Sequence, residues 1–140
     1  MEPVKLVYPV EGGDLIEAGE ASSKMKLTLK KLGLPPDVIR RASICMYEGE
    51  INMVIHAKGG SADVTVDEDA ITIVLDDNGP GIADVALAMK EGYSTASDRV
   101  RQLGFGAGMG LPNMKRYTDS MQIDSTVGIG TRITMRVLLG

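Results

Sequence analysis

Two polar side chains lie one helical turn apart in the middle of an apolar stretch of the sequence. Glu48 and Asn52 are four residues apart in "ICMYEGEINMVIHA", so a helix would place both on one face. Asparagine is a poor residue for the middle of a helix, and an amide among apolar side chains needs a polar partner. An amide oxygen can bind Mg²⁺, which prefers oxygen ligands, and a carboxylate one turn earlier can act as a general base.

The same two residues also fit a plain structural interpretation, in which Asn52 is a hydrogen-bonded core amide and Glu48 a surface charge. The residue types alone leave both interpretations open. His56 lies one further turn along the same face, and by itself it is expected to be structural. Glu50 points elsewhere on such a helix, and we expect it to be a solvated charge.

A second candidate group follows an apolar run that ends at Asp77. Asp77, Gly79 and Gly81 form the pattern D-x-G-x-G in "DDNGPGI". A carboxylate at a strand end can accept a hydrogen bond from an exocyclic amine such as that of adenine, and glycines let a flat ring lie close to the backbone. An ordinary Asp-Asn-Gly turn is the alternative.

A third group is the glycine run in "LGFGAGMGLPNMK", which includes Gly106, Gly108 and Gly110. It matches neither the dinucleotide-binding pattern G-x-G-x-x-G nor a P-loop, because the third glycine is out of register and no Gly-Lys pair is present. Glycines before a helix let backbone N–H groups approach an anion, and the helix N-terminus adds partial positive charge. A flexible connector is the alternative interpretation.

The elements that must position these groups follow from periodicity and turn residues. The pattern predicts helices and strands in the order strand, helix, helix, strands, loop, helix, strands, and residues 1–140 form a single domain without internal repeats. We therefore expect an α+β fold, a two-layer sandwich with helices on one face of a mixed, mostly antiparallel sheet. The predicted strands are 4–10, 62–66, 70–77, 120–126 and 131–139, and the predicted helices are 14–33, 37–60, 83–92 and 111–119.

Composition excludes some classes of function. The formal net charge of −4 argues against a protein that binds nucleic acid through phosphate attraction. The single cysteine, Cys45, cannot form an internal disulfide and indicates a reducing compartment. No apolar run approaches the roughly 20 residues that span a bilayer. The sequence therefore predicts a cytoplasmic protein that binds neither nucleic acid nor membrane.

Taken together and in this order, the three groups resemble the GHKL ATPase superfamily, which includes gyrase, a heat-shock chaperone, histidine kinases and mismatch-repair ATPases. The resemblance runs from Asp37 to Val137 and includes "GIGT" before the last strand. It implies ATP and Mg²⁺ as cofactors, with Asn52 as the metal ligand and Glu48 as the catalytic base. It also implies an adenine pocket and a phosphate loop at these positions: Asp77, Gly79, Gly81 and Thr131 for the former, and Gly106, Gly108 and Gly110 for the latter, with residues 83–110 as a lid.

Within that superfamily, the chain is similar to the small anti-sigma-factor type serine/threonine kinases of bacterial partner switching. Glu48, Asn52 and His56 match the E-x-x-x-N-x-x-x-H helix of that group, whereas "EGYSTA" departs from its Phe-Thr-Thr-Lys type lid sequence. The resemblance implies a protein partner, such as an anti-anti-sigma-like protein, a sigma factor or another regulator, and allows a homodimer. An ATP-gated binding module without phosphotransfer and the catalytic domain of a split histidine kinase remain as alternatives.

Overall fold

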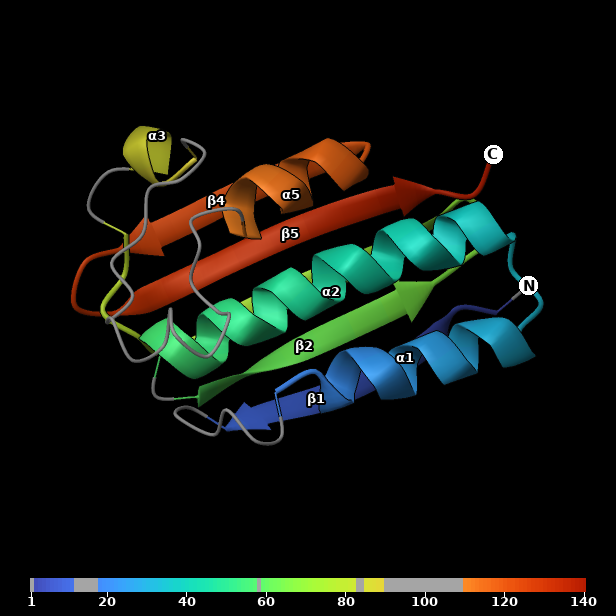
Figure 1. Cartoon of the computed structure of the whole chain (residues 1–140), viewed down its shortest axis with the longest axis horizontal. Helices are drawn as coiled ribbons and strands as arrows, with labels where there is room; N and C mark the ends of the chain where they lie inside the picture. The colour runs from blue at the N-terminus through green and yellow to red at the C-terminus, as the bar shows by residue number, and fades with distance from the viewer. Residues whose placement is uncertain (1, 12–17, 58, 83–84, 90–109) are drawn as a thin grey trace.

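A five-stranded sheet forms one layer of the molecule (Figure 1). The computed structural model describes residues 2–11, 18–57, 59–82, 85–89 and 110–140. The strand order is β1-β2-β3-β5-β4, and all four of these pairings are antiparallel. The strands are β1 (Val4–Glu11), β2 (Gly59–Val66), β3 (Ala70–Asp77), β4 (Ser120–Thr126) and β5 (Gly130–Leu138).

The three longer helices form the second layer, in front of the sheet in Figure 1. The middle helix, α2, packs against α1 on one side and α5 on the other. The expected α+β sandwich with helices on one face is confirmed. The helices are α1 (Glu20–Lys31), α2 (Pro36–His56), the short α3 (Val85–Ala88) and α5 (Gly110–Tyr117). Within the part of the chain that the structure describes, no helix is both long and apolar enough to cross a membrane.

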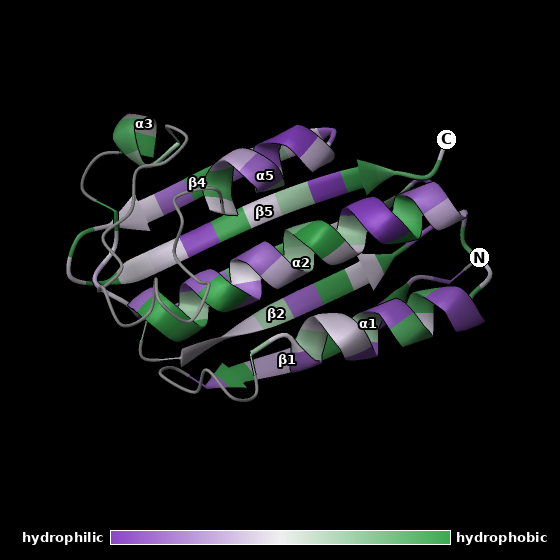
Figure 2. Cartoon of the chain, viewed as in Figure 1, coloured by the Kyte–Doolittle hydropathy of each residue, from purple (hydrophilic) through white to green (hydrophobic). Residues whose placement is uncertain are grey.

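Side chains alternate between the two faces of the sheet, as the period-two patterns predict. Polar and apolar bands alternate along β5 in Figure 2, where Ile133, Met135 and Val137 are buried and Arg132 and Arg136 are exposed. The apolar face of the sheet packs on the helix layer, and the core lies between the two layers. This packing holds α2 at a fixed place along the face of the sheet, with its C-terminal end near the turn after β3.

The turn between β2 and β3 shows how local chemistry sets the strand register. Oδ1 of Asp67 accepts hydrogen bonds from the backbone amides of Asp69 and Ala70, at 2.8 and 2.9 Å. An aspartate that bonds its own turn in this way stabilises the reversal of the chain. The hairpin that we expected around residues 67–69 is therefore confirmed, and it directs β3 so that its last residue is Asp77.

The end of α2 differs from the prediction. We expected a helix over 37–60 that ends at Gly59 and Gly60, but α2 ends at His56 and both glycines begin β2. Ala57 already has an extended backbone, with φ of −120° and ψ of 165°. The physical reason is strand pairing, because Gly59 and Gly60 lie opposite Glu11 and Val10 of β1. Glycine also suits position 60, where a side chain would meet the Asp76 carbonyl and, at 2.9 Å, the Met53 sulfur.

Candidate functional site

Helices α2 and α5 lie side by side and run in opposite directions. Three contacts join them, from the C-terminal end of α2 toward its N-terminal end: Asn52 with Gly110, Glu48 with Asn113, and Arg41 with Tyr117. Such opposed contacts fix the register of two antiparallel helices. The packing of this helix pair therefore positions Asn52, Glu48 and Arg41.

The carboxylate of Glu48 meets an amide on α5. Nδ2 of Asn113 donates a hydrogen bond to Oε1 of Glu48 at 3.2 Å, and both side chains are half-buried. Asn113 was not among the expected site residues. The signal was present, since Asn113 is a helix-disfavoured amide in "LPNMK", the same argument that singled out Asn52.

The amide of Asn52 lies against the first residue of α5. A Cβ added to Gly110 would be 3.1 Å from Nδ2 and 3.2 Å from Oδ1 of Asn52. The missing side chain thus allows the N-terminus of α5 to approach the Asn52 amide. A helix N-terminus carries unpaired N–H groups and partial positive charge, so an anion and an amide ligand can meet at this point.

The other end of α5 is tied to α2 through Arg41. Its guanidinium donates to the carbonyl of Tyr117 at 3.2 Å and forms an ion pair with Asp119 at 2.7 Å. Asp119 also accepts a hydrogen bond from the amide of Leu138 on β5. This amide, and then the Arg41 guanidinium, lower the pKa of Asp119. The charged form of Asp119 therefore links α2, α5 and the sheet.

The second cluster is formed by the end of β3. Oδ1 of Asp77 accepts hydrogen bonds from the amides of Gly79 and Thr131, at 2.9 and 3.2 Å. Thr131 lies opposite Asp77 in the register of β3 and β5. The strand pairing and the turn therefore hold this carboxylate between them.

A hydroxyl pair extends this cluster toward β4. Thr131 is only 7% exposed, and its Oγ1 lies 2.9 Å from Oγ of Ser125. Ser125 in turn accepts a hydrogen bond from the amide of Ile82 at 2.7 Å. Gly81, beside it, has a φ of +80°, a conformation that glycine adopts without strain. Ser125 is a second residue that sequence reasoning did not identify.

The two clusters lie close together because α2 ends beside the turn after β3. A Cβ at Gly79 would lie 2.9 Å from Cβ of Ala57, the residue that follows α2. His56 is half-buried at the same place. Burial lowers the pKa of His56 below its ordinary value of 6.5, and the negative charge of Asp77 opposes this shift. The helix pair and the strand end therefore form one candidate site.

Part of the expected site lies outside the described residues. Gly106 and Gly108 fall in the stretch 90–109, and of the expected lid, 83–110, only 85–89 and Gly110 are described. Among the described residues, no group of three or more His, Cys, Asp or Glu side chains is arranged to hold a metal ion. An amide ligand such as Asn52 can share a cation with oxygens from a ligand or water, which is how Mg²⁺ is commonly bound.

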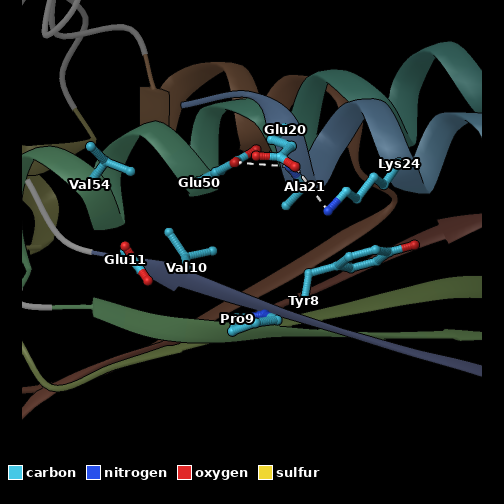
Figure 3. A pocket seen from close by; sticks show the side chains of 9 residues that line it. All are labelled: Tyr8, Pro9, Val10, Glu11, Glu20, Ala21, Lys24, Glu50 and Val54. Atoms are coloured by element: carbon cyan, nitrogen blue, oxygen red, sulfur yellow. Dashed lines mark hydrogen bonds and ion pairs between the residues drawn. The ribbon is translucent and has the colours of Figure 1, made fainter. Parts of the chain in front are cut away.

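A cavity of about 250 Å³ lies on the other side of α2, between α1 and β1 (Figure 3). Glu50 lines this cavity and is only 3% exposed, so the expectation of a solvated charge is wrong. Its two oxygens accept hydrogen bonds from the amides of Ala21 and Ser22, both at 3.1 Å. Glu50 thus caps the N-terminus of α1, whose own N-cap residue, Gly19, offers no side-chain cap.

Comparison with known proteins identifies the family of the chain. Residues 39–140 match the family described as "Histidine kinase-, DNA gyrase B-, and HSP90-like ATPase". The serine/threonine-protein kinase RsbT of Bacillus subtilis is 30% identical over 110 residues, which cover 74% of this chain and 75% of that protein. The anti-sigma F factor of Clostridium novyi is 36% identical over 95 residues, which cover 64% and 63% of the two chains.

A third relative is similar over a longer stretch. The anti-sigma F factor of Caldanaerobacter subterraneus subsp. tengcongensis is 32% identical over 114 residues, which cover 76% of each chain. The family match includes α2 from Ile39 onward, the end of β3 and the whole of α5. The chain therefore belongs to the family of histidine kinase-, DNA gyrase B- and HSP90-like ATPases.

Proposed function

We propose that this protein binds ATP with Mg²⁺ and transfers the terminal phosphoryl group to a serine or threonine of a regulatory protein partner. The observation that carries the proposal is the approach of Glu48 and Asn52 to the N-terminal half of α5. The ATPase family supports ATP as the ligand. The names of the similar kinase and anti-sigma factors support the class of activity and partner.

The adenine would lie at the end of β3. Two backbone amides hold Oδ1 of Asp77, and we assign its Oδ2 to the exocyclic amine of adenine. Gly79 and Gly81 would shape the wall of this pocket, because a side chain at either position would meet Ala57 or the backbone of Thr126 and force the turn away. The hydroxyl pair of Thr131 and Ser125 would order water on the adenine side.

The phosphates would lie at the N-terminus of α5. Gly110 would bring its backbone amide close to a phosphate oxygen, and Gly106 and Gly108, outside the described residues, would do the same. The helix dipole favours an anion at this end. Asn52 lies against Gly110 and would offer its amide oxygen to Mg²⁺. The bound cation would neutralise the charge that develops on the phosphates.

Glu48 would act as the general base. It lies one turn before Asn52 on the same face of α2, so it would face an acceptor hydroxyl that approaches the terminal phosphate. Its carboxylate would accept the hydroxyl proton as the oxygen attacks in line. The other residues of the site position the reactants, and positioning with electrostatic stabilisation contributes most to phosphoryl transfer.

The decisive experiment maps where the phosphate goes. The purified protein is mixed with labelled ATP, Mg²⁺ and each protein encoded beside its gene, and modified residues are located by mass spectrometry. Phosphoserine or phosphothreonine on a partner is the expected result. Phosphohistidine would instead identify the catalytic domain of a split histidine kinase. ATP-dependent capture of a partner without any phosphate transfer would identify a nucleotide-gated binding module.

A further inference from the structure

We infer that Asn113 is a positioning residue that orients Glu48 for proton abstraction, an inference that rests on the proposed function. The contact that points to this role is the hydrogen bond from Nδ2 of Asn113 to Oε1 of Glu48, at 3.2 Å. The two residues are 65 positions apart in the chain and come from different helices. Neither helix alone can hold the carboxylate in this orientation.

The helix pair holds Asn113 in place from both sides along α5. One turn before it, Gly110 lies against Asn52. Directly after it, the carbonyl of Met114 lies 3.8 Å from the buried sulfur of Cys45. At the end of the helix, Arg41 bonds the Tyr117 carbonyl. A sliding or rotation of α5 that separated Asn113 from Glu48 would therefore break contacts at three other places.

The chemistry of the contact suits a general base. An amide nitrogen donates and cannot accept, so it bonds a carboxylate oxygen without competing for the proton that the base must take up. The bond also restricts the Glu48 side chain to fewer of the rotamers that a free glutamate side chain adopts. With Oε1 held, Oε2 is the oxygen that we assign to the acceptor proton. Asn113 thus prepares the base and does not itself touch the reacting atoms.

Both helices of the pair carry ionisable side chains besides Glu48. On α2, Arg41 is engaged by Asp119, and burial raises the pKa of the Cys45 thiol to about 12, so that thiol stays neutral. On α5, the ionisable side chains that follow Asn113 are Lys115 and Arg116, which are exposed, and Tyr117, which is half-buried. A negative charge introduced at position 113 would therefore act directly on Glu48.

The experiment compares Asn113→Leu and Asn113→Asp with wild type, with Lys115→Gln as an exposed control on the same helix. ATP affinity is measured by calorimetry, and the single-turnover release of phosphate from Mg·ATP to water is followed between pH 5 and 9. The Leu variant should bind ATP within about threefold of wild type but react about 10- to 100-fold more slowly, the range expected when a reacting group loses its orientation. In the Asp variant, the acidic limb of the pH–rate profile should move up by about one unit or more, because two adjacent carboxylates resist joint ionisation.

A second measurement tests the contact without turnover. In the NMR spectrum, the side-chain amide protons of Asn113 should shift as pH is lowered and Glu48 takes up a proton, and Glu48→Gln should abolish that shift. Three results would each overturn the role of Asn113 while leaving the proposed function intact. These are an unchanged rate in the Leu variant, an unchanged pH profile in the Asp variant, and amide protons whose shifts are the same in wild type and Glu48→Gln. A wild-type protein that does not bind Mg·ATP would overturn the proposed function, and this inference with it.

Discussion

The carboxylate of Asp77 links the turn after β3 to the neighbouring strand. Its Oδ1 already accepts two backbone hydrogen bonds, from Gly79 and Thr131. A carboxylate has lone pairs enough for further donors, so the same side chain can stabilise the strand end and recognise a ligand. The two roles can be separated by substitution with asparagine. Its amide oxygen can still accept the backbone hydrogen bonds that stabilise the strand end, but it lacks the negative charge that would strengthen a hydrogen bond to a ligand.

Asp77→Asn is expected to weaken ATP binding while leaving the fold intact. The Asn oxygen can still accept the bonds from Gly79 and Thr131, so the melting temperature should change little. The charge-assisted hydrogen bond that we assign to Asp77 and adenine would be worth about 1.5–3 kcal/mol, or roughly ten- to hundredfold in affinity. Calorimetric titration with ATP measures this.

Asp76→Asn is the matched control for this substitution. Asp76 is the adjacent residue of β3, and its carboxylate forms an ion pair with Arg132 at an exposed position. Its loss should leave ATP affinity unchanged. Wild-type affinity in Asp77→Asn would remove Asp77 from the adenine pocket, and equal weakening in both variants would indicate a general electrostatic effect.

At the scale of elements, the antiparallel pair of α2 and α5 forms the phosphate end of the proposed site. Arg41 and Asp119 fix the C-terminal end of α5, and the N-terminal end lies against Asn52. The geometry at the ligand end depends on the absence of a side chain at position 110. A change of one methyl group there should therefore affect function far more than stability.

Gly110→Ala is expected to reduce the affinity for Mg·ATP without destabilising the protein. The added Cβ would lie 3.1 Å from the Asn52 amide, so the amide must move. Alanine is a better helix former than glycine by up to about 1 kcal/mol, which offsets the crowding in the free energy of unfolding. The affinity is measured with and without Mg²⁺, and the stability by thermal unfolding. Unchanged metal-dependent affinity would show that Asn52 can shift without loss and does not ligate the cation.

The elements were largely predictable because their signals are local. The hairpins follow from alternation and from turn residues such as Asp67, and the pairing of Glu48 with Asn52 follows from helical spacing. The burial of Glu50 was not predictable, because it depends on α1 packing on that side of α2. The contact of Asn113 with Glu48 likewise depends on the register of two helices far apart in the sequence. Helical periodicity shows which residues share a face, but not which element covers that face.

At the scale of the whole molecule, the helix layer and the strand ends meet at His56. Folding lowers the pKa of this residue through burial, against the opposing charge of Asp77. Between the lowered pKa and the ordinary value of 6.5, the unfolded chain binds more protons than the folded protein. The contribution of neutral His56 to the stability of the fold is therefore fully present above about pH 6.5. This contribution is lost as the pH falls from there through the lowered pKa.

His56→Gln should accordingly flatten the pH dependence of stability below neutrality. The wild-type protein should lose stability between pH 7 and 5, whereas the variant should lose less, because Gln takes up no proton. Urea unfolding at several pH values measures this difference. The contribution of carboxylates such as Asp119, whose pKa is also lowered, appears at more acidic pH and should be the same in both proteins. Parallel curves between pH 7 and 5 would show that His56 is not the titrating group.

In the transfer step that we propose, Glu48 removes the proton from the acceptor hydroxyl, so this role is measured by the rate of a single turnover in Glu48→Gln. The phosphorylation of a captured partner is followed at saturating Mg·ATP, with Asp37→Asn, which removes an exposed carboxylate from the first turn of α2, as the control. We expect Glu48→Gln to bind ATP within a few-fold of wild type and to transfer phosphate about 10²–10⁴-fold more slowly, the usual contribution of a positioned general base. A transfer rate equal to that of the wild type would show that Glu48 is not the base.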